Sequence, residues 1–218
     1  MIFPTLRGQS FGYANVALYS REWLAGKAFD GNPLLDPLIC QRMVDEMHGD
    51  LGVAWSYGGW LEDRSDLWDG SYLTDRRTTA HLGVDFNAPA GTPVSADVSL
   101  RCLLVDSDDP EPHGWGTRVI ARVIGEPIVL IFGHLMSVRC VVGSTVEAGD
   151  IFAEVGTSDR NGGWHSHVHV QAVVAENDET FLQDLPFIDG YGDFGEIRDL
   201  SRVFPDPMRF VDIRSGAR

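Results

Sequence analysis

The chain has 218 residues, and 44% of them are hydrophobic, which suits one moderate domain with extensions and leaves ample apolar material for a core. A formal net charge of −15 argues against a nucleic-acid partner and against anionic membrane surfaces. The sequence contains no apolar run long enough to span a bilayer, so we expect no membrane partner.

The first residues and the cysteines bear on the compartment. The amino-terminal ten residues lack the basic stretch followed by an apolar stretch that marks a secretory signal. Cys40, Cys102 and Cys140 are odd in number and form no CxxC motif. We therefore expect free thiols in a reducing compartment, and hence a cytoplasmic protein.

The residue patterns divide the chain into three parts. Residues 1–70 form an extension with one predicted helix, residues 71–178 form a strand-rich core, and residues 179–218 form a loop-rich extension. The predicted fold is mainly β: an antiparallel folded sheet or barrel-like sandwich with a partly helical amino-terminal extension.

The helix in the first extension has clear start and stop signals. Asp36 can cap it, Pro37 fits its first turn, and Gly49 is expected to end it. Its apolar face comprises Ile39, Cys40, Met43, Val44 and Met47. Four aromatic residues follow in a glycine-broken stretch, where they fill a core or line a cleft: Trp55, Tyr57, Trp60 and Trp68.

The core shows strand periodicity in several places. Residues 94–104 alternate between apolar and polar with a nearly regular period of two. Residues 117–124 and 128–132 are joined by Gly125-Glu-Pro127 and are predicted to form a hairpin. Residues 167–174 again alternate, which predicts a half-buried strand.

The last of these strands carries two histidines on one face. Residues i and i+2 of a strand share a face, so His167 and His169 should project together while Val168 points to the core. One imidazole can hold a metal while its neighbour stays within reach of water on that metal. His165 continues the same face, so a ligand register shifted to His167 or His165 stays open.

A second motif, His81-Leu-Gly-Val-Asp85, requires a bend in the chain. Gly83 and Pro89 argue for extended chain rather than helix. Four residues of straight strand span about 13 Å, too far for two side chains to share an ion held at about 2 Å. The chain must therefore bend between His81 and Asp85, and Gly83 permits a bulge or kink there.

Taken together, these motifs supply the inventory of a catalytic zinc site. His81, Asp85, His167 and His169, with His134 of a Gly-His-Leu between them, provide imidazoles and a carboxylate with histidines to spare. Catalytic zinc takes three protein ligands and leaves a fourth position for water. The pattern predicts a metallohydrolase.

These residues also carry a resemblance to a known family. His81-Leu-Gly-Val-Asp85-Phe-Asn-Ala-Pro-Ala-Gly-Thr-Pro93-Val resembles the first zinc motif of the lysostaphin-type (LytM-like) metallopeptidases. The Gly133-His134-Leu135 stretch and the glycine turns at 142–156 resemble the middle section of that family, and His167-Val-His169 resembles its closing motif. The resemblance spans about residues 78–175 with the motifs in order.

The resemblance implies a role for each residue. His81, Asp85 and His169 would hold one zinc ion per chain, while His134 and His167 would be catalytic, polarising the water and accepting its proton. Such roles suit the chemistry, because zinc lowers the pKa of bound water toward about 7 and histidine titrates in that range.

Two features depart from the usual pattern of the family. Asn161-Gly-Gly-Trp-His-Ser166 replaces a Gly-Pro before the closing histidine, and Gln171 stands where a glutamate is common, which removes a possible carboxylate partner for a ligand. The first stretch and Pro205-Asp-Pro207 are similar to a branch in which the domain lies between a kinase-like phosphotransferase and a pyridoxal-phosphate aminotransferase.

The expected function is zinc-dependent hydrolysis of a peptide bond, and the family implies a peptide of the peptidoglycan type as substrate. One alternative is an intracellular zinc hydrolase acting on a small amide, which the acidic charge and missing signal favour. A second is a non-catalytic zinc-bearing binding or regulatory domain. A purely structural zinc site is disfavoured because only three ligands can be assigned.

Overall fold

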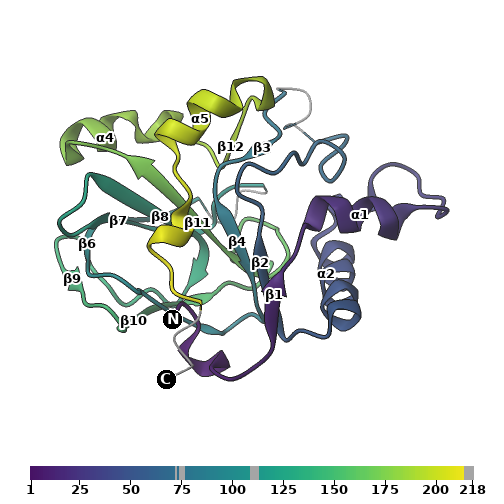
Figure 1. The fold of residues 1–218 in the computed structure, drawn as a ribbon, viewed down its shortest axis with the longest axis horizontal. Coiled ribbons are helices and arrows are strands. Elements are labelled where there is room, and N and C mark those ends of the chain that lie inside the picture. Colours follow the sequence, from purple (N-terminus) through teal and green to yellow (C-terminus); the bar gives the residue numbers. More distant parts are fainter. Residues whose placement is uncertain (72, 74–76, 109–112, 214–218) are drawn as a thin grey trace.

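A ten-stranded sheet forms the body of the molecule in a computed structural model that describes residues 1–71, 73, 77–108 and 113–213 (Figure 1). Along its main path the strands follow the order β1 (Phe11–Tyr13), β2 (Trp55–Gly58), β4 (Val84–Asn87), β11 (His167–Val174), β8 (Ile128–Met136), β7 (Thr117–Val123), β6 (Leu100–Ser107) and β9 (Thr145–Val146). Strand β10 (Ile151–Val155) pairs with β8 and with β5 (Pro93–Ser95).

The pairings confirm the predicted mainly β, antiparallel-dominated fold. The β1–β2 pair is parallel, and the other strand pairs are antiparallel. The sheet does not close into a barrel. Beyond β4 it continues through β2 to the edge strand β1, and its path ends at β9 on the other side.

Period-two alternation buries both faces of the central strands. On one face, Val168 and Val170 of β11 join the largest apolar cluster with Phe132 and Phe152, whose rings meet edge to face at 5.0 Å. On the opposite face, buried side chains pack with residues of α4 (Asp178–Asp184) and the following turn: Ile120, Val129, Ile131, Val173, Phe181 and Leu185. This two-sided burial fixes the register of the strands that carry the site.

The amino-terminal extension contains two α-helices where one was predicted. Helix α2 (Pro37–Leu51) begins as expected, since the Asp36 side chain accepts hydrogen bonds from the backbone N–H groups of residues 38 and 39. Its predicted end at Gly49 is wrong: the helix continues to Leu51 and is capped by Gly52, which adopts the left-handed conformation (φ 66°). Helix α1 (Val16–Leu24), capped by Asn15, was not anticipated.

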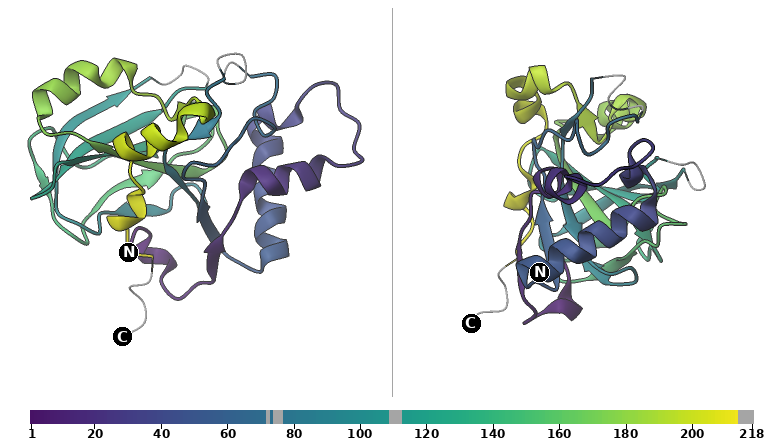
Figure 2. Two further views of the ribbon diagram at one scale, coloured as in Figure 1. Left: turned by 45° about the horizontal axis from the view of Figure 1, so that its top comes forward. Right: turned by 90° about the vertical axis from the view of Figure 1, so that its right-hand side faces the viewer.

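Both helices lie beside one edge of the sheet, as the turned views show (Figure 2). They enclose a second apolar cluster with Leu67, Trp68 and Trp164. The aromatic stretch divides accordingly: Trp55 and Tyr57 belong to the sheet core, whereas Trp68 belongs to this second cluster. Within the described residues, none of the helices combines the length and apolarity needed to cross a membrane.

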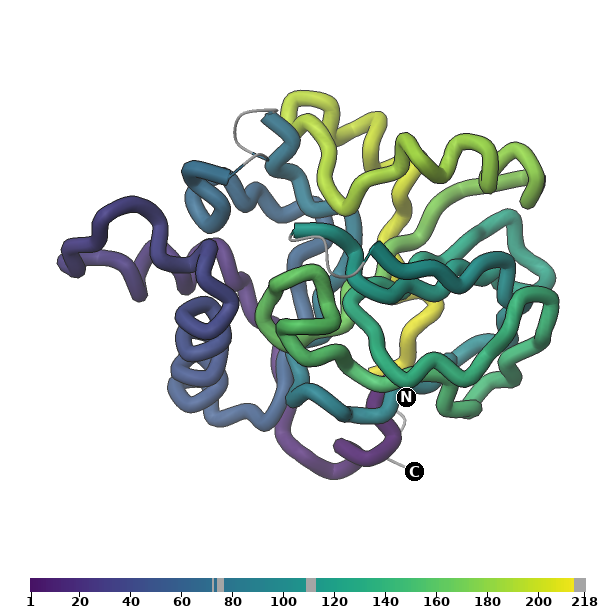
Figure 3. The backbone as a smooth tube through the Cα atoms, turned by 180° about the vertical axis from the view of Figure 1, so that it is seen from behind, coloured from purple at the N-terminus to yellow at the C-terminus, as the bar shows by residue number. Residues whose placement is uncertain are grey.

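The segment after the last long strand returns over the sheet (Figure 3). It contains α4, the short strand β12 (Tyr191–Gly192) and α5 (Ile197–Val203), and β12 pairs with β3 (Ala80–His81) in a separate two-stranded sheet. Short 3-10 turns complete the chain at Pro4–Leu6, Pro33–Leu35, Leu185–Phe187, Phe194–Glu196 and Pro207–Arg209.

Two of the three strand predictions hold and one needs correction. The hairpin is β7 and β8, and residues 167–174 form β11. The alternating run at 94–104 is not one strand, because the chain turns at residues 96–99 and passes from β5 to β6. These two segments then pair with different partners, β10 and β7.

Candidate metal centre

The predicted bend between His81 and Asp85 exists, and a change of sheet produces it. His81 ends β3, which pairs with β12, whereas Asp85 lies in β4, which pairs with β11. Gly83 lies at the junction without a positive φ, and a Cβ there would meet His169 Nε2 at 2.5 Å and the Val170 carbonyl oxygen at 2.6 Å. Glycine is therefore required for the close approach to β11 rather than for backbone freedom.

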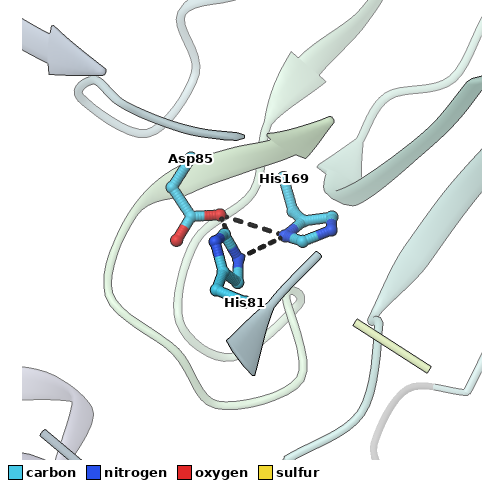
Figure 4. A group of neighbouring side chains, drawn as sticks. All are labelled: His81, Asp85 and His169. Atoms are coloured by element: carbon cyan, nitrogen blue, oxygen red, sulfur yellow. Dashed lines mark hydrogen bonds and ion pairs between the residues drawn. The ribbon is translucent and has the colours of Figure 1, made fainter. Parts of the chain in front are cut away.

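Strand β11 brings the third residue to the same place. His169 is directly opposite Asp85 in the β11–β4 register, and His167 is two residues away on the same face. The structure thus brings together His81, Asp85 and His169 (Figure 4). His81 Nε2 lies 2.9 Å from His169 Nδ1 and 3.3 Å from Asp85 Oδ1, and His169 Nδ1 lies 3.1 Å from that oxygen.

The hydrogen bonds of the two imidazoles fix which nitrogen carries the proton. His81 Nδ1 lies 3.0 Å from the Gly59 carbonyl oxygen, which can only accept, so Nδ1 donates and Nε2 keeps its lone pair. His169 Nε2 donates to Gln171 Oε1 at 3.1 Å, since the amide nitrogen of Gln171 donates to the Asp189 carbonyl oxygen. The lone pair of His169 is therefore on Nδ1.

Three electron-pair donors consequently face one another: two imidazole nitrogens and one carboxylate oxygen. Such a buried arrangement is repulsive without a cation, and its edges of 2.9–3.3 Å compare with about 3.3 Å for the edge of a zinc tetrahedron with legs near 2 Å. The residues present therefore fit a zinc ion with the open position of a catalytic site.

Burial and charge keep this set in its binding form. His81 and Asp85 are 1% and 2% exposed. Burial, followed by the charge of Arg64, lowers the pKa of His81 to about 3, so the imidazole is neutral at pH 7. Burial alone would raise the pKa of Asp85, but His81, Arg64 and His167 hold it well below its usual range. Both groups thus hold free lone pairs at neutral pH.

His134 reaches the site through a bulge in strand β8. In the β7–β8 ladder Val119 pairs with Phe132 and Thr117 with Leu135, so one residue more lies between these pairs on β8 than on β7. His134 is the residue that adopts a positive φ of 62° there, and its backbone N–H donates to the Trp115 carbonyl oxygen. A non-glycine residue in this conformation is strained, as is common at functional sites.

The loop that departs from the family pattern orients both spare histidines. His134 Nδ1 donates to the Asn161 carbonyl oxygen at 2.8 Å, and His167 Nδ1 donates to the His165 carbonyl oxygen at 2.8 Å. Each Nε2 therefore keeps its lone pair, and the rings lie 4.4 Å apart between centroids. Burial lowers the pKa of both side chains, so each is a neutral proton acceptor.

His165 does not join the cluster. Its Nε2 donates to Asn87 Oδ1 at 3.0 Å, because the Asn87 amide nitrogen donates to Ser56 Oγ, and its Nδ1 lies 3.6 Å from Cys40 Sγ. Both ring nitrogens are engaged away from the three donor atoms. The geometry thus disfavours the alternative in which the ligand register shifts to His165.

Sequence reasoning missed Arg64, which supports the carboxylate. The Arg64 side chain is 2% exposed; its Nη1 donates to Asp85 Oδ2 at 2.6 Å and its Nε to Glu62 Oε2 at 2.8 Å. Its partner Asp85 lies 21 residues away, and no local pattern announces the pair. By contrast, Gln171 follows His169 at strand spacing, and its amide oxygen fills the role expected of the absent glutamate.

The donor set opens into a cavity that two segments wall off. We name residues 59–68 the wall segment and residues 189–192 the covering segment. Its polar and aromatic lining comprises Arg64, Trp68, His81, Asp85, His113, Trp115, His134, Trp164, His165, His167, His169, Asp189 and Tyr191.

Comparison with known proteins places this site in a family context. Residues 79–180 match the sequence model described as Peptidase family M23. The chain is 30% identical to a mutant catalytic domain of the prophage-encoded M23 protein EnpA from Enterococcus faecalis, with 44% of this chain and 68% of that one covered and a TM-score of 0.37.

Two further solved structures are similar. One is the catalytic domain of the antimicrobial peptidase lysostaphin from Staphylococcus simulans, at 26% identity over 50% of this chain and 79% of that one, with a TM-score of 0.40. The other is a zinc-containing peptidase from Vibrio cholerae, at 23% identity over 45% and 28%, with a TM-score of 0.38. A search of curated proteins found no significant match.

Proposed function

We propose that His81, Asp85 and His169 hold one zinc ion per chain and that His134 and His167 carry out proton transfer. The premise is that this chain belongs to peptidase family M23 and is therefore a zinc metallopeptidase. The observation that carries the proposal is the convergence of three lone-pair atoms at 2.9–3.3 Å with no proton between them. When bound, zinc would supply a Lewis acid that polarises the scissile carbonyl and acidifies a water.

The protein side chains do the remaining work. Gly59 and Gln171 hold the two ligand imidazoles in the correct tautomer, and Arg64 fixes the second carboxylate oxygen of Asp85. The Nε2 atom of His134 or His167 accepts the proton of the attacking water, and the resulting imidazolium returns it to the leaving amine nitrogen as the C–N bond breaks. Once protonated by the water, that same Nε2–H can also donate to the oxyanion, whereas a neutral Nε2 with its lone pair cannot.

The substrate class follows from relatives and is part of the proposal. The family acts on peptide bonds, and lysostaphin is an antimicrobial peptidase, which supports a peptide of the peptidoglycan type. The alternative of a non-catalytic zinc-bearing domain is less well supported, because the structure brings both spare histidines to the donor set with free Nε2 atoms.

Metal analysis coupled to hydrolysis assays tests the function. We expect about one zinc per purified chain and zinc-dependent cleavage of glycyl peptides or wall fragments, abolished by chelation and restored by zinc. Zinc content without hydrolysis of glycyl peptides, wall fragments or cell extract would favour the binding-domain alternative.

The compartment is a separate proposal. Cys40, Cys102 and Cys140 are free thiols, and Cys40 is buried with a pKa that burial raises to about 12. We infer a reducing, cytoplasmic location, in which such thiols persist. Cell fractionation with thiol labelling checks this, and recovery of the protein from the medium or periplasm would contradict it.

A further inference from the structure

We propose that His165 is a positioning residue for the catalytic base His167, and that helix α2 of the amino-terminal extension holds His165 in place. This role rests on the proposed function and deepens it, because it brings a helix outside residues 79–180 into the catalytic machinery. Three observations carry it: the contacts between His165 and His167, the anchoring of the His165 ring, and a second bond from α2 to the same turn.

His165 holds His167 in two ways. The His165 carbonyl oxygen accepts a hydrogen bond from His167 Nδ1 at 2.8 Å, which leaves the lone pair of His167 on Nε2. The two rings also stack, with centroids 4.4 Å apart and an angle of 18° between their planes. The hydrogen bond sets the tautomer of His167 and the stack sets the plane of its ring. Together they determine where Nε2, the atom that accepts the proton, is directed.

The ring of His165 is itself anchored at both nitrogens. Its Nε2 donates to Asn87 Oδ1 of β4 at 3.0 Å, and its Nδ1 keeps a lone pair 3.6 Å from Cys40 Sγ of α2, whose thiol is a weak donor. His165, Asn87 and Cys40 are 2%, 0% and 1% exposed. Turning the ring would leave buried polar atoms without partners, which is costly. The anchors therefore keep the flat face of His165 against His167.

Helix α2 also holds the peptide group that orients His167. The backbone N–H of Ser166 donates to Gln41 Oε1 at 2.7 Å. This N–H and the His165 carbonyl belong to one peptide group, which is planar, so fixing the N–H fixes the direction of the carbonyl that accepts from His167. The Asn161 side-chain amide donates to the same carbonyl at 3.0 Å. The carbonyl is thus aimed by contacts on both sides of the peptide bond.

A double-mutant cycle tests whether His165 acts through His167. With zinc content confirmed in each variant, His165→Ala should lower kcat about 10- to 100-fold with KM nearly unchanged, the cost of misplacing a catalytic group by about 1 Å. In the His167→Ala background, His165→Ala should have no further effect on kcat. A merely structural role would instead lower kcat by the same factor in both backgrounds.

Two neighbouring residues of α2 test the part played by the helix. Gln41→Met removes the acceptor for Ser166 N–H and should lower kcat about 3- to 10-fold, the scale of one hydrogen bond. The matched control Arg42→Met, whose side chain is 75% exposed and pairs with Glu46, should leave kcat unchanged. Equal kcat values for the two variants would contradict the role of α2, and this comparison holds even if His165→Ala fails to fold.

Nitrogen NMR of the zinc-free protein gives a readout independent of hydrolysis. At about pH 8, above the ordinary pKa of histidine, the His167 ring should be the Nδ1-protonated tautomer in the wild type and a mixture of tautomers in His165→Ala. Its resonances are assigned by their absence from His167→Ala.

An unchanged tautomer in His165→Ala, additive effects in the cycle, or loss of zinc from His165→Ala would each overturn the inference. Failure of the proposed function is distinguishable, because no variant would then hydrolyse peptides although the change of tautomer remained. Failure of this inference alone would leave His165→Ala as active as the wild type.

Discussion

Two regions build the cavity, the strands of the sheet and the segments that cover them, and they contribute different properties. Strands β4, β8 and β11 supply Asp85, His134, His167 and His169 from positions fixed by two buried faces and a shared ladder. The wall and covering segments supply Arg64, Trp68 and Asp189, which line the cavity beside the donor atoms. The strands thus hold the donor atoms, whereas the wall and covering segments line the cavity around them.

The largest expected effect comes from the donor atoms themselves. His81→Ala, Asp85→Ala or His169→Ala should each remove most of the bound zinc and abolish hydrolysis, because two remaining donors cannot hold a catalytic ion. Zinc content by atomic absorption checks this. His165→Ala is the matched control on the neighbouring turn, and it should keep its zinc because both ring nitrogens of His165 are engaged elsewhere. Full zinc retention by all three ligand variants would contradict the assignment.

The next effect separates proton transfer from metal binding on the same strands. His134→Ala and His167→Ala should keep zinc and fold yet lose about 10²–10⁴-fold in kcat, the usual scale of general acid–base catalysis. Steady-state kinetics beside a zinc determination measures both properties. Loss of zinc in His167→Ala would instead show that this residue is a ligand and that the register along β11 is shifted.

A third prediction concerns Arg64 in the wall segment. Arg64→Met should destabilise the protein by about 3–5 kcal/mol, because it leaves Asp85 Oδ2 and Glu62 as buried charges without a partner. Urea unfolding measures the effect, and added zinc should recover part of it by neutralising Asp85. The control Arg202→Met, at an exposed ion pair with Asp199, should change the free energy of unfolding by less than about 1 kcal/mol. Equal effects of the two substitutions would contradict a supporting role for Arg64.

The smallest difference is expected between two glycines near His169. Gly83→Ala should weaken zinc binding about 10- to 100-fold, because its Cβ would lie 2.5 Å from His169 Nε2 and 2.6 Å from a backbone oxygen and would push β4 from β11. Gly190→Ala should be nearly neutral, since its Cβ would meet His169 and Trp115 at an ordinary 3.7 Å. Competition with a zinc chelator measures both affinities, and the reverse order would show that the covering segment, rather than the strand, positions His169.

Much of the site was predictable from local sequence, for a physical reason. The period of two in residues 167–174 places His167 and His169 on one face of any strand they form, and the four-residue spacing of His81 and Asp85 demands a bend near Gly83. The start of α2 at Asp36 and Pro37 is similarly local, because a cap acts on the N–H groups two and three residues away. The end of α2 was mispredicted, since the helix runs to Leu51 and Gly52, not Gly49, takes the left-handed capping conformation.

What only the tertiary structure decided depends on contacts between distant segments. The Arg64–Asp85 pair, the Gly59 carbonyl behind His81 and the covering of the site by residues 189–192 join positions 21 to more than 100 residues apart. A sequence pattern reports the period of an element and its caps, but not which loop will fold over it. By itself the sequence predicted the mainly β fold and singled out the three residues proposed as donors. The covering of those donors arose only from the packing of residues 59–68 and 189–192 beside the strands that hold them.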